Sequence, residues 1–131
     1  MIVLDTHVLV WAAADERKLG RKARALINRL WDTGEVAVSA MTFWEIALLQ
    51  SKGRLQTEVA DWRAQRLAAG LVELPTNGAV GIHAVELRGL PDDPADRLIV
   101  ATALAQRAGL MTADDKLLNW PHVLERHDAR A

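Results

Sequence analysis

The sequence predicts an α/β sandwich built around a mainly parallel sheet. Short apolar runs alternate along the chain with longer segments of helical periodicity, which is the order of elements in parallel α/β proteins. The length of 131 residues fits one domain, predicted here over 1–131. With 50% hydrophobic and 25% charged residues, such a domain can bury a substantial core.

The expected elements of the first half are, in order, a strand over 2–4, a helix over 6–14, a helix over 21–31, a strand over 36–38 and two helices over 41–50 and 57–69. The first strand is an apolar triplet that ends at Asp5. The second helix carries its apolar residues on one stripe and ends at Gly34. A break at residues 51–53 separates the last two helices, which are therefore expected to form a helical hairpin beside the sheet.

The expected elements of the second half are a strand over 71–74, a helix over 78–87, a helix over 94–108, a strand over 110–112 and a short edge strand over 123–124. Pro75 closes the first of these strands. Asp93 and Pro94 are the signature of an N-cap followed by proline at the first helical position. Gly109 is expected to end the helix that begins there.

Composition excludes several classes of protein. The absence of cysteine excludes a disulfide framework, a thiol nucleophile and a cysteine-ligated zinc site. No apolar run approaches the roughly 18 residues of a membrane span, and residues 1–5 lack the features of a secretory signal, so we expect a cytoplasmic protein without membrane contact. The formal net charge of -1 excludes nucleic-acid binding by bulk positive charge, but not through a local basic patch.

Four carboxylates occupy positions where charged residues are unexpected. Asp5 lies between two apolar stretches, and Glu45 is the only charged residue in the segment 41–49. Asp96 falls on the apolar face of its helix, and Asp114 closely follows a strand. Because ligands bind at the carboxyl ends of parallel strands, these acids are expected to converge on one edge of the sheet.

Convergence of four carboxylates would require a divalent cation to offset their mutual repulsion. Hard oxygen ligands without cysteine select Mg²⁺ or Mn²⁺ over zinc. The histidines show no metal-ligand spacing; they are His7, His83, His122 and His127. The sequence therefore predicts an all-carboxylate magnesium or manganese site.

Most of these acids also have a purely structural interpretation. Asp5 can cap the first helix, Asp96 suits the dipole of a helix N-terminus, and an acid at 114–115 can cap the turn that follows. Asp93 is expected to be a plain N-cap. This interpretation is weakest for Glu45, which lies within an apolar helix.

Together these segments resemble the PIN-domain ribonucleases, and in particular the VapC-type toxins of bacterial toxin-antitoxin pairs. The segments are the strand that ends in Asp5-Thr6, the Trp-Glu-Ile-Ala sequence around Glu45, the run Asp-Pro-Ala-Asp-Arg-Leu-Ile-Val-Ala-Thr-Ala at 93–103, and Leu-Met-Thr-Ala-Asp at 110–114. The resemblance covers essentially the whole chain. It implies a three-layer α/β/α sandwich and an endoribonuclease that depends on Mg²⁺ or Mn²⁺.

The resemblance also implies roles for individual residues. By position, it assigns metal binding and catalysis to Asp5, Glu45, Asp96 and Asp114, with Thr112 as a supporting hydroxyl. We expect Asp5 and Asp96 to contact the metal most directly. Bound divalent cations supply the activated water and the charge neutralisation that phosphodiester hydrolysis requires. The alternative is a catalytically silent binding module in which the acids are only caps.

The resemblance implies three partners: an RNA substrate, a cognate antitoxin protein and a second copy in a homodimer. Six basic residues in one stretch form a candidate phosphate-guiding patch; they are Arg17, Lys18, Arg21, Lys22, Arg24 and Arg29. A solvated helix face is the alternative interpretation of that stretch. Trp62, in the expected hairpin at 41–69, could line a groove for the antitoxin, whereas core packing explains most other tryptophans.

Overall fold

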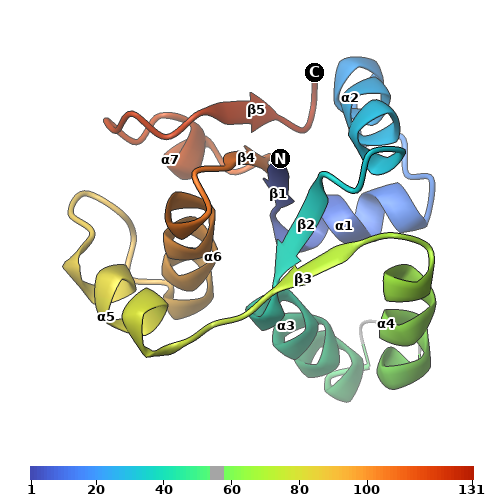
Figure 1. Cartoon of the computed structure of the whole chain (residues 1–131), viewed down its shortest axis with the longest axis horizontal. Coiled ribbons are helices and arrows are strands. Elements are labelled where there is room, and N and C mark those ends of the chain that lie inside the picture. The colour runs from blue at the N-terminus through green and yellow to red at the C-terminus, as the bar shows by residue number, and fades with distance from the viewer. Residues whose placement is uncertain (54–57) are drawn as a thin grey trace.

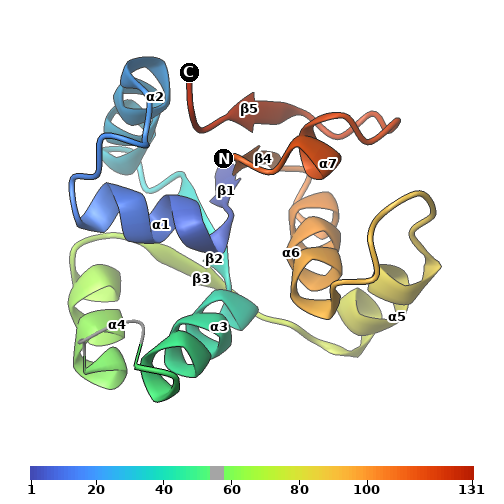
Figure 2. The same cartoon turned by 180° about the vertical axis from the view of Figure 1, so that it is seen from behind.

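The structure is a computed structural model that describes residues 1–53 and 58–131. The described elements are β1 (Ile2–Leu4), α1 (Thr6–Ala13), α2 (Arg21–Trp31), β2 (Val36–Ser39), α3 (Ala40–Ser51), α4 (Val59–Ala68), β3 (Val72–Leu74), α5 (Gly78–Glu86), α6 (Pro94–Ala105), β4 (Gly109–Thr112), α7 (Asp115–Leu118) and β5 (Arg126–Asp128). Figure 1 and Figure 2 show this arrangement from opposite sides. The expected helix start at Thr57 lies outside the described residues.

The strands form one sheet in the order β3-β2-β1-β4-β5, and every pairing between neighbours is parallel. The central strand β1 pairs with β2 on one side and with β4 on the other. The chain builds the sheet outward from β1 in one direction and then returns to add β4 on the opposite side. This reversal of strand order creates a crevice at the carboxyl ends of β1 and β4, where ligands bind in open α/β sheets.

Helices cover both faces of the sheet, so the predicted three-layer α/β/α sandwich is confirmed. Alternate residues of β1 point to opposite faces. Val3 belongs to a buried cluster with residues of α5 and α6, whereas Leu4 belongs to a second cluster with residues of α1, α2 and α3. Within the described part of the chain, no helix is long and apolar enough to cross a membrane.

The hairpin of α3 and α4 is present, and aromatic packing joins its two helices. The rings of Phe43 and Trp62 meet edge to face with centroids 6.3 Å apart. Trp62 is half-buried and packs against the cluster that contains Leu4. The ring of Trp62 thus packs between the two helices, and the expectation that it lines a groove for the antitoxin stays a prediction.

Two expectations in the second half of the chain are wrong. The helix that begins at Pro94 ends at Ala105 rather than at 108, because Arg107 adopts a left-handed φ of 51°. Gly109 is consequently the first residue of β4 and not a helix terminator. The edge strand lies at Arg126–Asp128 rather than at 123–124, since β4 pairs with residues beginning at Arg126.

Candidate active site

Asp5 lies at the carboxyl end of the central strand, where hydrogen bonds of its backbone N–H and its carboxylate hold it. Its backbone N–H donates to the Met111 carbonyl of β4 at 2.9 Å. Its carboxylate accepts from the Thr112 hydroxyl at 2.8 Å and from the Thr6 backbone N–H at 2.8 Å. Asp5 is also the N-cap of α1, so the same residue follows the central strand and caps the first helix.

Glu45 reaches the same region from α3. The hydroxyl of Thr6 donates to its carboxylate at 2.5 Å and lies 3.1 Å from the hydroxyl of Thr42. Glu45 is half-buried, and the helical turns on either side of it are apolar. Thr6 therefore links the first two acids, since its backbone contacts Asp5 and its side chain contacts Glu45.

The remaining acids lie at the N-termini of two helices. Asp93 caps α6 by accepting from the backbone N–H of Asp96 at 3.1 Å. Asp114 caps α7 by accepting from the backbone N–H of Lys116 at 2.8 Å, and its own N–H donates to the Thr112 hydroxyl at 3.1 Å. The capping roles foreseen for positions 93 and 114 are both present.

These side chains surround one pocket of about 390 Å³. Its lining residues are Asp5, His7, Trp11, Glu45, Asp93, Asp96, Ala113 and Asp114. The structure thus brings together all four carboxylates that the sequence singled out. Thr112 is fully buried beneath them and contacts the pocket through Asp5.

Besides Ala113, three lining residues were not foreseen as part of the site. His7 received no role, Asp93 was interpreted only as a cap, and Trp11 was grouped with tryptophans of the core. The sequence does contain a signal for His7 and Trp11. These residues are four positions apart on the helix that Asp5 caps, so they lie on the same face of that helix. Asp93 lies three residues before Asp96 and therefore at the same helix end.

The pocket concentrates negative charge in a partly buried place. Burial, and then the charges of Asp5, Asp93, Glu45 and Asp114, raise the pKa of Asp96 to about 7. Burial also raises the pKa of Asp5, although hydrogen bonds from Thr112 and Thr6 oppose that shift. Burial raises the pKa of Glu45 against the hydrogen bond from Thr6. Among the described residues, no lysine or arginine forms an ion pair with any of these acids.

A hard divalent cation fits this set of donors. Several carboxylates without a basic partner provide oxygen ligands and an excess of negative charge that such an ion would neutralise. In residues 1–53 and 58–131, however, no group of three or more histidine or acidic side chains is already arranged as a metal site. The hydroxyls of Thr112 and Thr6 donate hydrogen bonds to carboxylate oxygens of Asp5 and Glu45, respectively. The acids therefore share a pocket without forming a finished coordination shell.

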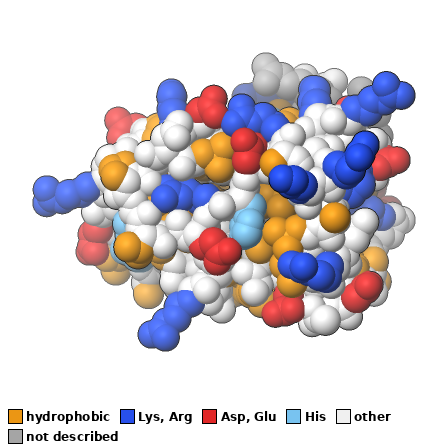
Figure 3. All heavy atoms as spheres, turned by 90° about the horizontal axis from the view of Figure 1, so that it is seen from above, with side chains coloured by type: hydrophobic (Ala, Val, Ile, Leu, Met, Phe, Trp, Pro, Cys, Tyr) orange, Lys and Arg blue, Asp and Glu red, His pale blue; other side chains and the backbone are white. Residues whose placement is uncertain are grey.

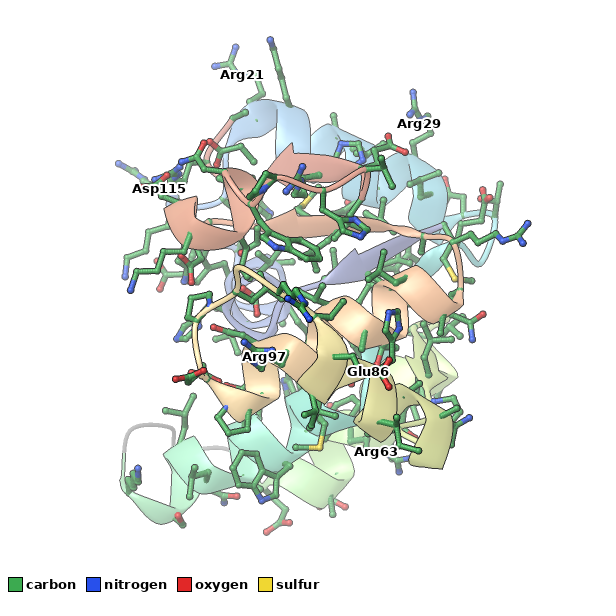
Figure 4. The ribbon with its side chains drawn as sticks, turned by 90° about the vertical axis from the view of Figure 1, so that its left-hand side faces the viewer. Arg21, Arg29, Arg63, Glu86, Arg97 and Asp115 are labelled. Carbon is green, nitrogen blue, oxygen red and sulfur yellow. The ribbon has the colours of Figure 1, made fainter. Side chains whose placement is uncertain are left out.

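The expected basic patch is only partly available. Lys18, Arg21 and Lys22 are exposed, and Lys and Arg side chains gather over α2 on the face seen in Figure 3. Arg21 and Arg29 extend away from the helix in Figure 4. Arg24 is engaged instead, because it pairs with Asp15 at 2.7 Å. Lys18 precedes α2, and its ammonium lies 5.9 Å from the centre of the Trp11 ring.

The chain matches a known protein family over most of its length. The model of the PIN domain family matches residues 2–122. The chain belongs to the PIN-domain family. The resemblance noted in the sequence is thereby confirmed.

Individual relatives extend over nearly the same length as this PIN domain. A curated relative from Mycobacterium tuberculosis strain H37Rv, named Ribonuclease VapC22, is 35% identical over 124 residues and covers 92% of each chain. The solved structure of FitAB bound to a DNA fragment has a TM-score of 0.71 at 20% identity, covering 100% of this chain and 96% of that one. VapBC2 from Rickettsia felis, bound to promoter DNA, has a TM-score of 0.66 at 24% identity, covering 98% and 100%. These two structures show that the fold is shared.

Proposed function

We propose that this PIN domain is a divalent-metal-dependent endoribonuclease, and that it is the toxin of a toxin-antitoxin pair. The observation that carries the proposal is the single pocket in which Asp5, Glu45, Asp96 and Asp114 meet at the crevice between β1 and β4. The 35% identity to a relative named as a VapC ribonuclease supports the reaction class and the toxin role.

Asp5 and Asp96 would hold the cation most directly, with Glu45 and Asp114 completing its shell. Mg²⁺ or Mn²⁺ is the expected ion because the donors are carboxylate oxygens. When bound, such a cation activates water and neutralises charge on the phosphodiester. The site residues on this basis are the four acids together with Thr112.

The hydroxyl groups of the chain position these acids. Thr112 fixes one oxygen of Asp5 and also accepts a hydrogen bond from the backbone of Asp114, so it sets the relative position of two acids. Thr6 does the same for Asp5 and Glu45. Both threonine side chains are buried, which holds the carboxylates in place before substrate arrives.

The antitoxin would dock near the hairpin at 41–69, as the sequence suggested, but on a different tryptophan. Trp44 is 54% exposed and, with Leu48, lines a pocket of about 270 Å³ next to the acidic one. The two pockets share His7, Glu45 and Asp93. A solved structure that shares the fold is a toxin-antitoxin complex from Klebsiella pneumoniae, which supports a partner protein of this kind. A homodimer stays a prediction, as does the cytoplasmic location.

The catalytically silent binding module remains the alternative function. It is favoured by the capping roles of Asp93 and Asp114 and by the lack of a ready-made metal site among the described residues. It predicts that divalent cations neither change the stability of the protein nor cause cleavage of RNA. The nuclease proposal predicts an effect on both.

The deciding experiment is cleavage of single-stranded RNA by the purified chain with Mg²⁺, with Mn²⁺ and with EDTA. We expect cleavage with either cation and none with EDTA. Asp5→Asn should abolish cleavage without unfolding the protein, because an amide keeps the shape of the side chain and removes the charge that binds the cation. Asp32→Asn, at the exposed end of α2, is the matched control and should cleave normally. RNA that stays intact under all conditions would support the silent module.

A further inference from the structure

We propose that the end of the acidic pocket formed by Trp11 is a nucleobase subsite, in which one base of a single-stranded RNA stacks on the indole and Lys18 binds the adjoining phosphate. This inference rests on the proposed nuclease function, because the phosphate cleaved at the acids would fix the position of the next nucleotide. It adds a recognition element to a pocket otherwise described by its carboxylates.

The geometry of α1 places the subsite beside the reacting phosphate. The helix begins after Asp5, and Trp11 lies six residues further on, which corresponds to about 9 Å along the axis. His7 and Trp11 are four residues apart and therefore on one face of the helix. Both line the pocket that holds the acids, so this face leads from the acids to the indole. That length accommodates one nucleotide.

Trp11 packs against the core and also lines the pocket. The ring packs against the buried cluster that contains Leu9, yet it is only half-buried and lines the pocket. A rigid aromatic ring at the wall of a polar pocket is the kind of platform on which nucleobases stack in proteins that bind single strands.

Lys18 supplies the matching charge. Its ammonium lies 5.9 Å from the Trp11 ring centre, and within the described residues it forms no ion pair. The lysine stem is flexible, so the ammonium can leave the ring face to a base and move to a phosphate oxygen. The pocket then has an acidic end, where a cation is needed, and a basic end, where a phosphate can bind directly.

Such a subsite detects the presence of a base more than its identity. Every nucleobase has a π-face, so stacking tolerates sequence differences. The expected consequence is a requirement for an unpaired base next to the cleaved bond, since a base in a duplex cannot reach the indole without leaving its stack.

The test measures binding of a fluorescently labelled single-stranded RNA by anisotropy in Mg²⁺, with Asp96→Asn as the parent protein to slow cleavage. Adding Trp11→Leu should weaken binding about 10-fold, equivalent to about 1.4 kcal/mol. Adding Trp11→Phe should restore most of the affinity, because phenylalanine keeps a stacking face. An RNA with abasic positions should bind the parent about 10-fold more weakly than intact RNA and lose nothing further with Trp11→Leu.

Lys18 is tested through salt dependence. Lys18→Ala should reduce the slope of log affinity against log salt concentration by about 0.7, the contribution of one phosphate contact in a single strand. Arg88→Ala, at an exposed position in the connection between α5 and α6, is the control and should leave the slope unchanged. This measurement stands even if Trp11→Leu fails to fold.

The outcomes separate this inference from the function on which it rests. If the unmodified chain cleaves RNA but intact and abasic RNA bind the parent equally well, the subsite is overturned and the nuclease function stands. Loss of antitoxin binding in Trp11→Leu with unchanged RNA affinity would also overturn it, since the indole would then serve the partner. If the unmodified chain neither binds nor cleaves RNA, the function itself is overturned.

Discussion

Asp96 carries a charge that its surroundings oppose. It lies in the first turn of α6, where the helix dipole favours an acid, yet burial and four neighbouring carboxylates outweigh that benefit and raise its pKa to about 7. In the unfolded chain the same group ionises near its ordinary value of 3.8. The folded protein therefore binds a proton that the unfolded chain has lost over roughly pH 4–7.

The sign of the resulting pH dependence follows directly. Stability from protonated Asp96 is fully present below about pH 4 and is lost as the pH rises through about 7. Urea denaturation of the metal-free protein should show a midpoint that falls between about pH 5 and 7.5, and Asp96→Asn should make that fall shallower. Equal slopes for the two proteins would show that Asp96 titrates normally.

Glu45 offers a second test at the residue scale. Glu45→Gln should weaken Mg²⁺ binding and RNA cleavage while changing the melting temperature of the metal-free protein little, because glutamine can still accept the hydrogen bond from Thr6. If Glu45 instead formed a buried ion pair, breaking that pair would cost about 3–5 kcal/mol with or without metal. Melting curves with Mg²⁺ and with EDTA distinguish the metal-binding role from the ion pair. A large drop in melting temperature under both conditions would contradict the metal-binding role.

The sequence predicted the acids of the site better than its other residues, for a physical reason. A carboxylate such as Glu45 in an apolar segment is anomalous by itself, because uncompensated burial is costly. His7 and Trp11 are ordinary on the surface of a helix. Only the fold, which turns their face of α1 toward the acids, makes them part of the pocket.

At the scale of elements, one arginine holds the connection between α5 and α6. The guanidinium of Arg97 donates to the backbone carbonyls of Ala84, Leu87, Leu90 and Pro91 at 2.8–3.0 Å. Figure 4 shows this side chain between the two helices. Because Arg97 follows Asp96 on α6, the same turn that presents an acid to the pocket also fixes the segment leading into the helix.

Arg97→Lys should therefore destabilise the protein although the charge is kept. A single ammonium cannot replace the planar fork of donors, so some of these carbonyls would lose their partner, at a cost of about 1–3 kcal/mol in the free energy of unfolding. Chemical denaturation measures the loss. Arg88→Lys, at an exposed position in the same connection, is the control. Equal stability of both variants would show that water satisfies the carbonyls.

The elements that sequence patterns placed wrongly are those without a local signal. The end of α6 forms a Schellman-type turn, in which the N–H groups of Ala108 and Arg107 donate to the carbonyls of Ala103 and Leu104. The left-handed position of that turn holds Arg107 rather than glycine, so the sequence pattern did not indicate that the helix ends there. Strand β5 consists of Arg126, His127 and Asp128, and an edge strand this polar shows no hydrophobic alternation.

Over the whole molecule, the two pockets beside α3 suggest how cleavage and neutralisation are combined. The acidic pocket and the more apolar pocket of Trp44 share lining residues, so a partner seated on the second would lie next to the first. The two tryptophans of the hairpin have different environments. Trp44 is 54% exposed, whereas Trp62 packs against Phe43.

These environments predict opposite effects of two substitutions. Trp44→Ala should weaken binding of the cognate antitoxin about 30-fold, since truncating an aromatic anchor typically costs at least ~2 kcal/mol, while its melting temperature stays close to that of the unmodified chain. Trp62→Ala should lower the free energy of unfolding by about 1–3 kcal/mol, because it removes a packed ring from between α3 and α4. Calorimetric titration with the antitoxin and thermal melting measure the two quantities. If folded Trp62→Ala protein loses antitoxin affinity and Trp44→Ala does not, the partner binds the hairpin through the helix pair and not through the pocket beside the acids.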